Sequence, residues 1–321
     1  MSSFVLQRLL SFFITLAVTS VVVFGVLEWL PGNAAQVILG ETATPESLAA
    51  MEEKLGLHQP ALKRYLEWTG GLLQGQSGLS ISYSTPTLEL ITERLQVTLP
   101  LAIFAMLITV VLAFSMGLHA ASKQNSGADL GVMTLSQLGL ALPNFWLAIL
   151  LILLFAVQLQ WVSAGGFPGW TEDVGGGVFK ALRALILPAI ALAAVQTAIL
   201  TRVTRSAIIE SMSEDYARTA RAKGLSKQQV LWRHVLRNAM IPVVTIMGLQ
   251  FGNLITSAIV IENVFVLPGV GRLVFQAIAN RDLIVVRDVV MCLSAMVIAI
   301  NFLIDIVYAW IDPRLQHGLN T

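Results

Sequence analysis

The chain has 321 residues, of which 56% are hydrophobic and 12% are charged, and its formal net charge is +1. A soluble domain carries roughly 25% charged residues, and here the missing charge is concentrated in long uncharged stretches that a water-soluble core cannot bury. No basic block indicates nucleic-acid binding. Cys292 is the only cysteine, which excludes an intrachain disulfide and a cysteine metal site, and we expect no metal site.

Long apolar stretches recur along the chain. A helix needs about 20 apolar residues to cross the roughly 30 Å hydrocarbon layer. The first stretch is longer than the apolar core of a secretory signal, about 7–15 residues, so we interpret it as a retained span. We therefore predict an all-α, polytopic membrane protein with six transmembrane helices, at Leu9–Leu27, Leu95–Ser122, Leu130–Leu159, Ala184–Thr201, Asn238–Ile261 and Val289–Ile311.

The distribution of Lys and Arg predicts the orientation, because these residues are enriched in cytoplasmic loops. With both termini in the cytoplasm, eleven of the 20 Lys and Arg residues fall inside, although the outside loops are much longer. Thirteen of the 19 acidic residues then fall outside, which strengthens the contrast. We therefore predict that both termini are cytoplasmic.

The outer segment between the first two spans, from Pro31 to about Arg94, carries its own helical signals. Thr44 can cap a helix that begins at Pro45, and Gly56 can end it. A second amphipathic stretch follows, with one face formed by Leu62, Tyr65, Leu66, Thr69, Leu72 and Leu73. This segment is interpreted either as a docking platform for an external partner or as a lid packed on the outer ends of the spans.

The only long cytoplasmic segment, Arg202–Ile241, is the most informative part of the chain. Ser206–Lys223 lacks proline and glycine and predicts a helix. Gly224 predicts a left-handed stop, and Ser226 with Gln229 forms a capping-box pattern that begins a new helix. A stripe of small residues lets another backbone approach the first helix closely: Ser213, Ala217, Ala220 and Gly224. The alternative interpretation is a solvated cationic loop that only anchors the topology.

Polar residues inside spans are energetically expensive and are often functional. On span five, Gln250, Asn253 and Ser257 share one helical face, with Thr256 beside it, and span six contributes Asn301. These five residues are the candidate substrate path, because the amides of a peptide lose water when they enter a membrane protein. The alternative is that they only form hydrogen bonds between helices.

Several motifs together resemble a known family. The run from Tyr216 to Leu225, YARTARAKGL, is followed by RHVLRNA from Arg233 and by Ile241-Pro242. The chain also contains LGLHQP from Leu55, PNFWL from Pro143, ENVF from Glu262, PGVGR from Pro268 and the ending Asp312-Pro313-Arg314. Over its whole length the sequence resembles permeases of ABC importers, most closely the B-type subunit of the dipeptide, oligopeptide and nickel branch.

The resemblance implies a type I ABC importer permease architecture. Residues 1–94 would hold the first transmembrane helix and a long periplasmic loop. Residues 95–311 would form a five-helix permease core that includes the coupling loop 202–241, and residues 312–321 a short cytoplasmic tail. The resemblance also implies that the coupling loop contacts an ATP-hydrolysing subunit through Glu214, Asp215, Tyr216, Arg218, Thr219, Ala220, Arg221, Lys223 and Gly224.

The motif of the general permease family begins with Glu-Ala-Ala, six residues before its glycine. Arg218, Thr219 and Ala220 occupy these positions here, so a cation replaces the acid. The replacement of this acid by a cation resembles sequences of the peptide branch of the family. It does not specify which contacts Arg218 makes.

The partners implied by the resemblance are a C-type permease, two ATP-binding subunits, a periplasmic solute-binding protein and membrane lipid, all at the bacterial inner membrane. No cofactor is expected on this chain, because ATP and Mg would be bound by the partner subunits. Translocation would occur by alternating access. Peptides are the expected substrates, with nickel chelates, glutathione and opines as alternatives.

Two other functional classes lack the sequence features that they require. A self-contained secondary carrier would favour paired ionisable residues near the membrane midplane, and only Asp305 and His119 are available at its edges. An intramembrane enzyme would need a motif such as His-Glu-x-x-His or Gly-x-Ser-x-Gly, and neither occurs in the sequence. The phosphate-binding pattern Gly-x-x-x-x-Gly-Lys-Ser/Thr does not occur either, so we expect the energy to come from another chain.

Overall fold

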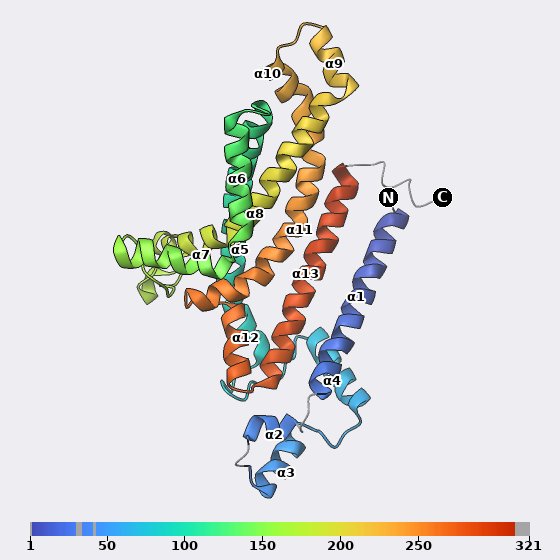
Figure 1. Cartoon of the computed structure of the whole chain (residues 1–321). Helices are drawn as coiled ribbons and strands as arrows, with labels where there is room; N and C mark the ends of the chain where they lie inside the picture. The colour runs from blue at the N-terminus through green and yellow to red at the C-terminus, as the bar shows by residue number, and fades with distance from the viewer. Residues whose placement is uncertain (1, 30–33, 41–42, 312–321) are drawn as a thin grey trace. The chain divides into compact units, whose positions relative to one another are not determined.

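The computed structural model describes residues 2–29, 34–40 and 43–311, and within these ranges every regular element is a helix (Figure 1). Five helical runs are long and apolar enough to span a membrane, and a bent pair of helices brings the number to six if it counts as one span. The predicted all-α membrane fold is therefore confirmed. The long runs are α1 (Ser2–Glu28), α5 (Thr87–Ser122), α8 (Val178–Ser213), the continuous run Lys227–Val264 and α13 (Leu283–Ile311).

The chain divides into two compact units. The first unit consists of Ser2–Thr98 and Pro268–Ala299, and the second of Leu99–Leu267 together with the residues from Ile300 onward. This division runs through α5 and α13, so both helices contribute to each unit. The predicted tail, 312–321, and the start of the outer segment at Pro31 lie outside the described residues.

The described part of the first unit also contains four short helices. They are α2 (Ala34–Leu39), α3 (Pro45–Lys54), α4 (Ala61–Leu73) and α12 (Val270–Ala279). The two helices predicted in the outer segment, α3 and α4, are confirmed. The Thr44 side chain accepts a hydrogen bond from the Ser47 amide (3.2 Å), and Gly56 adopts a left-handed φ of 64° after α3.

Helix α4 packs on the ends of two long helices of the first unit. The Tyr65 hydroxyl lies 2.8 Å from the Ser20 hydroxyl of α1, and the buried Trp68 indole donates to Asp288 of α13 (2.8 Å). A second buried acid, Asp282, accepts from the Ser80 hydroxyl (2.7 Å). Buried acids that are fully hydrogen-bonded fix the position of the groups around them. The packing of α4 therefore corresponds to the lid interpretation of this helix.

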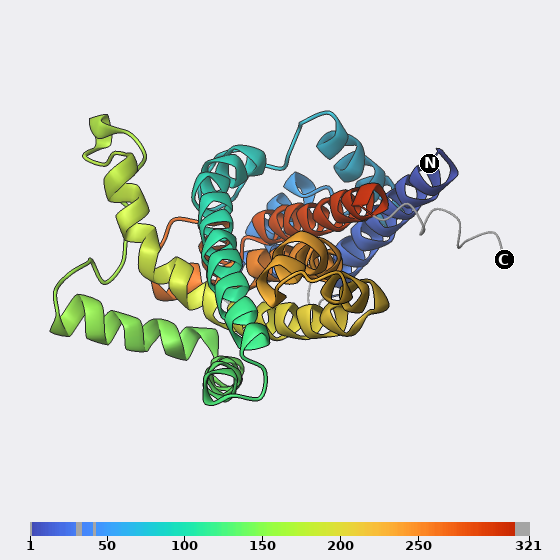
Figure 2. The same ribbon diagram turned by 90° about the horizontal axis from the view of Figure 1, so that it is seen from above.

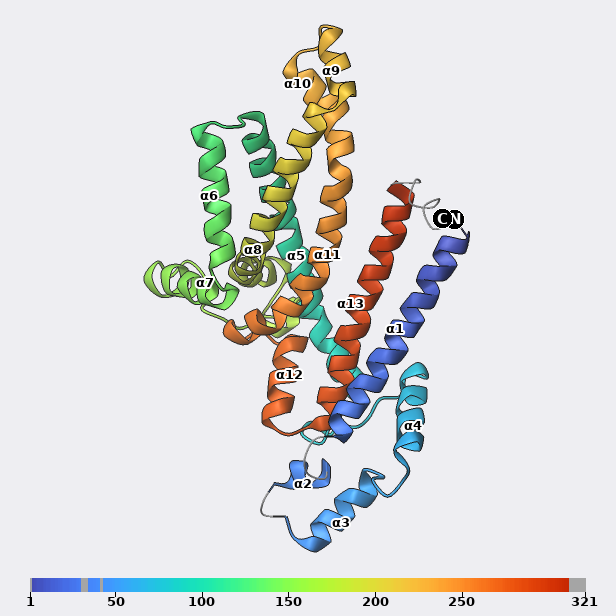
Figure 3. The ribbon, with the colours of Figure 1, turned by 45° about the vertical axis from the view of Figure 1, so that its right-hand side comes forward.

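The second unit is organised around two antiparallel helices, α8 and α11 (Leu236–Val264), which lie side by side (Figures 1 and 3). The buried face of α8 is rich in alanine and leucine, which allows close helix packing. The remaining elements of this unit are α6 (Gly127–Ala141), α7 (Asn144–Leu151), the π-helical turn η1 (Ile152–Gln158), the short 3-10 turn η2 (Glu172–Val174), α9 (Asp215–Ala222), α10 (Lys227–Val230) and the π-helical turn η3 (Leu231–Val235).

The third predicted span is broken. The two parts, Gly127–Ala141 and Asn144–Gln158, meet at an angle of 100°, so the prediction of one uninterrupted helix over Leu130–Leu159 is wrong. Figure 2 shows the green helix α6 nearly end-on while α7 runs across the view. Pro143 explains the break, because its ring disfavours helical conformation in the residue before it. Leu142 is accordingly extended, with φ −89° and ψ 124°.

Helices α5 and α8 approach closely at Gly117. A Cβ atom at this position would lie 2.7 Å from the Thr204 Cβ and 3.0 Å from the Thr201 carbonyl oxygen. A side chain here would therefore push the two helices apart. Gly131 of α6 offers a matched comparison, because a Cβ atom there meets no atom within 4 Å.

We expect Gly117→Ala to lower the free energy of unfolding by about 1–3 kcal/mol through overpacking. Gly131→Ala should leave it unchanged or raise it slightly, because alanine favours the helix by roughly 0.5–1 kcal/mol. The measurement is the thermal unfolding midpoint of both variants purified in the same detergent. Equal midpoints would contradict the close approach of α5 and α8.

Candidate functional site

The candidate functional site is the segment that joins α8 to α11, residues 214–235, which we call the α9–α10 hairpin. It extends beyond the shared end of α8 and α11 (Figures 1 and 3). The chain enters it from α8 and leaves it through α10 and η3, which continue into α11 without interruption from Lys227 to Val264. A force applied to the hairpin is therefore applied directly to the α10–α11 run.

The hairpin begins at a break that the sequence analysis did not predict. Helix α8 ends at Ser213, Glu214 is extended with φ −66° and ψ 155°, and α9 begins at Asp215. The predicted single helix over Ser206–Lys223 is therefore wrong. The Ser213 hydroxyl donates to the Glu210 carbonyl (2.7 Å), a local side-chain contact that competes with helix continuation.

The turn after α9 confirms the predicted local chemistry. Gly224 has a φ of 86°, and the Leu225 amide donates to the Ala220 carbonyl (3.3 Å), as in a glycine-terminated helix. The Ser226 hydroxyl accepts from the Gln229 amide (3.3 Å), while the Gln229 side chain accepts from the Ser226 amide (2.9 Å). Both halves of the capping box are thus present, and the two helices are joined by a defined turn.

Two of the four stripe residues, Ala217 and Ala220, face the interior of the hairpin, whereas Ser213 and Gly224 are exposed. Ala217 and Ala220 are buried and pack in one cluster with Val230, Leu231 and Val235. The backbone that approaches these alanines is therefore that of the chain's own α10–η3 segment. Ala220 is the one predicted coupling residue that is buried, so it can support a partner-binding surface without contributing much area to it.

The other eight predicted coupling residues are exposed: Glu214, Asp215, Tyr216, Arg218, Thr219, Arg221, Lys223 and Gly224. Asp215 and Arg218 form an exposed ion pair at 3.6 Å within one turn. Arg221 instead braces the hairpin, because its guanidinium donates to the carbonyls of Ala217 (3.3 Å) and Met212 (3.1 Å). These eight residues thus offer one aromatic ring, that of Tyr216, among charges of both signs.

Two polar contacts connect the hairpin end of the second unit to the turn between α5 and α6. Lys227 donates to the Ser122 carbonyl at the end of α5 (3.3 Å). Arg205 of α8 forms a bidentate ion pair with the buried Asp129 of α6, in which its Nε and Nη2 atoms donate to the two carboxylate oxygens (2.6 and 2.7 Å). A bidentate arginine–carboxylate pair has a fixed geometry. This pair was not predicted from the sequence, because no local pattern connects two residues that are 76 positions apart.

The five candidate path residues do not form one surface. Gln250 is buried and donates to the Gln196 carbonyl of α8 (3.4 Å), so it joins two helices. Ser257 is half-buried, whereas Asn253, Thr256 and Asn301 are exposed. Asn253 and Thr256 belong to an exposed stripe of α11 that also contains Leu249 and Val260. The stripe gives this helix a mixed polar and apolar outer surface.

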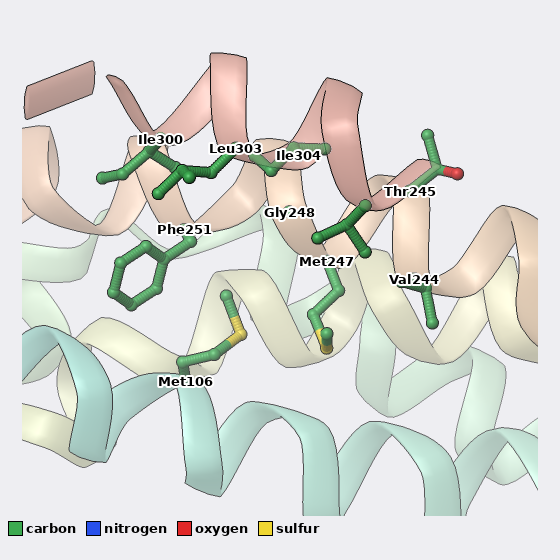
Figure 4. Close-up of a pocket in the computed structure, with 10 residues that line it drawn as sticks. Met106, Val244, Thr245, Met247, Gly248, Phe251, Ile300, Leu303 and Ile304 are labelled. Carbon is green, nitrogen blue, oxygen red and sulfur yellow. The ribbon is translucent and has the colours of Figure 1, made fainter. Parts of the chain in front are cut away.

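A pocket of about 340 Å³ in the second unit has a different character (Figure 4). Met106, Met247, Phe251 and Ile304 contribute to a lining that is almost wholly apolar. Its one polar side chain, Thr245, donates its hydroxyl to the Ile241 carbonyl of the same helix (3.0 Å). The pocket therefore has no side chain free to form hydrogen bonds with the amides of a peptide, and its lining is suited to a hydrocarbon group. Among the described residues, no group of three His, Cys, Asp or Glu side chains is placed to hold a metal ion.

Comparison with known proteins gives consistent matches. The family described as "Binding-protein-dependent transport system inner membrane component" matches residues 110–317, and the family of the corresponding N-terminal part matches residues 1–102. The glutathione transport system permease protein GsiC of Escherichia coli is 38% identical over 99% of this chain and 100% of its own length. The dipeptide transport system permease protein DppB of Alkalihalophilus pseudofirmus is 36% identical with the same coverage.

A solved structure shares the fold at low sequence identity. An inward-facing structure of the MetNI methionine ABC transporter aligns with a TM-score of 0.58 and 16% sequence identity. The alignment covers 70% of this chain and 97% of the other. This likeness supports the ABC importer permease fold for this chain.

We expect Ser226→Ala to loosen the hairpin, because loss of an N-cap side chain costs about 0.5–2 kcal/mol. Amide hydrogen exchange over residues 226–230 should become about 2- to 30-fold faster, in proportion to that free energy. Ser213→Ala is the matched control, because its hydroxyl donates to the Glu210 carbonyl of its own helix and takes no part in the capping box. Unchanged exchange in Ser226→Ala would show that the capping box does not stabilise the turn.

Proposed function

Since the chain belongs to the family of binding-protein-dependent inner membrane transport components, we propose that it is the B-type permease subunit of an ATP-driven peptide importer. As a permease it is a membrane component of such a transporter and not its ATPase. The complete importer would contain a C-type permease, two ATP-binding subunits and a periplasmic solute-binding protein. ATP and Mg would be bound by the ATP-binding subunits, with no cofactor on this chain.

The observation that carries the proposal is the α9–α10 hairpin. Its exposed face presents Tyr216, Arg218 and Asp215, and its buried face joins α9 firmly to the α10–η3 segment. A partner that binds the exposed face and moves would therefore displace the hairpin as one body. Because the hairpin continues into the α10–α11 run, this displacement would be transmitted to a membrane helix.

In this mechanism the ATP-binding subunits close on ATP and push the hairpins of the two permeases. The spans then rotate from an inward-open to an outward-open state, and hydrolysis resets them. The hairpin would lie in the cytoplasm, as would both termini, in agreement with the clustering of Lys and Arg in this segment. The location would be the bacterial inner membrane.

The substrate path would lie between this chain and the C-type permease, because one subunit provides only half of a central cavity. The exposed stripe of α11 with Asn253 and Thr256 is the surface best suited to line it, together with Asn301 of α13. Amide and hydroxyl groups in this stripe can replace the water that a peptide loses. Gln250, which is buried against α8, would act by fixing the packing of α11.

Small peptides are the proposed substrates. The relatives named above transport a dipeptide and glutathione, both of which contain peptide bonds and free charges. Nickel chelates and opines remain alternatives, because selection among such solutes would rest with the external binding protein.

The experiment that tests the proposal is affinity purification of the tagged chain from its native membrane in mild detergent, followed by mass spectrometry. We expect a second permease, ATP-binding subunits and a solute-binding protein to be retained. Recovery of a folded chain alone, in repeated preparations, would favour a self-contained carrier and would contradict the proposal.

A second test addresses the hairpin itself. Gly224→Pro should abolish peptide uptake, because proline fixes φ near −65° whereas Gly224 requires 86°. Gly224→Asn is the matched control, because asparagine tolerates the left-handed conformation, and it should retain most of the uptake. Both variants should insert normally, as measured by their abundance in the membrane fraction. Normal uptake by Gly224→Pro would contradict the transmission of force through the hairpin.

A further inference from the structure

A second pocket lies in the first unit. Its volume is about 280 Å³. The end of α1, the segment between α3 and α4, helix α4 and the start of α13 enclose it. Small-molecule pockets measure about 300–1,000 Å³, so this one suits a small ligand. Unlike the pocket of Figure 4, it is lined by several charged side chains.

Two arginines form the cationic part of the lining. Arg64 is paired with Glu28 through one terminal nitrogen, and its Nε atom is buried without a hydrogen-bond partner. Arg287 lies 4.7 Å from the centre of the Trp68 ring and donates from Nε to Asp288 (3.2 Å). Within the described part of the chain, this leaves the terminal nitrogens of Arg287 without a hydrogen bond. Guanidinium groups with free donors are the preferred partners of carboxylates.

Acceptors form the other part of the lining. The Gln59 Oε1 atom is buried and has no hydrogen-bond partner within the described ranges. The carboxylates of Glu28 and Glu67 also line the pocket, and both are partly exposed. A buried acceptor without a donor is destabilising, so the pocket favours a ligand that brings N–H groups. An ammonium group or a peptide amide provides them.

We propose that this pocket binds a small zwitterion, either a free amino acid or a dipeptide. The ligand's carboxylate would face Arg64 and Arg287, and its N–H groups would face Gln59, Glu28 and Glu67. The balance of two guanidinium groups and two carboxylates argues for this class of ligand, because a simple anion or a simple cation would meet like charges as well as opposite ones. The pocket would bind this zwitterion whichever solute the permease carries, because its lining residues are not among the candidate path residues.

The test is isothermal titration of the full-length chain in lipid nanodiscs with L-alanyl-L-alanine. We expect saturable binding that weakens about tenfold or more when either terminal charge is removed, in N-acetyl-L-alanyl-L-alanine or L-alanyl-L-alanine amide, as expected for lost charge-assisted hydrogen bonds. Binding of the two blocked peptides with undiminished affinity would overturn the proposal, as would the absence of saturable binding to the unmodified dipeptide.

Variants locate the binding site. Gln59→Met removes an acceptor that has no partner within the described ranges, so it should weaken dipeptide binding about tenfold while the unfolding temperature of the ligand-free chain stays the same or rises. Arg64→Gln should abolish binding. Lys63→Gln is the matched control on the same helix, because Lys63 does not line the pocket and its ion pair with Glu67 is exposed.

The variant Asn253→Leu separates this site from the proposed transport path. Loss of dipeptide binding in Asn253→Leu, with normal binding in Gln59→Met, would place the ligand on α11 and overturn the proposal while leaving the transport function intact. Loss of binding in Gln59→Met alone would support it, even if Arg64→Gln fails to fold.

Discussion

The structure depends on one constraint, the need of every backbone amide and carbonyl to find a hydrogen-bond partner where water is absent. Long helices satisfy it internally, and the chain changes direction only where particular residues provide another solution. Pro143 permits the bend between α6 and α7, since proline has no backbone N–H group that the bend would leave without a hydrogen-bond partner. At Gly224 and Ser226 the free helix ends are satisfied by the turn and by the capping box.

In the proposed mechanism, the α9–α10 hairpin would have its mechanical role on one face and its recognition role on the other. Ala217 and Ala220 face the α10–η3 segment, where their small size allows close packing, and the charged and aromatic side chains face outward. A substitution on the outer face would change which partner is recognised, and one on the inner face would change how rigidly movement is passed on. The Arg205–Asp129 pair extends the same rigidity to the α5–α6 turn.

Local rules were enough to predict most of the helices and the chemistry of the hairpin turn, because capping and left-handed glycine depend on a few neighbouring residues. The break at Pro143 was missed because hydropathy alone treats proline within an apolar run as part of the span. The orientation of Ala217 and Ala220 depends on packing that a helical pattern does not specify. The Trp68–Asp288 hydrogen bond joins residues 220 positions apart, so no local pattern indicates it.

The uninterrupted run from Lys227 to Val264 contains 38 residues. At a rise of 1.5 Å per residue it is about 57 Å long, nearly twice the roughly 30 Å thickness of the hydrocarbon layer. Tilting such a rod by about 10° around its middle would displace each end by roughly 5 Å, as its length dictates. A modest rotation within the bilayer thus corresponds to a displacement of the hairpin comparable to one helical turn, large enough for a neighbouring subunit to generate or to detect.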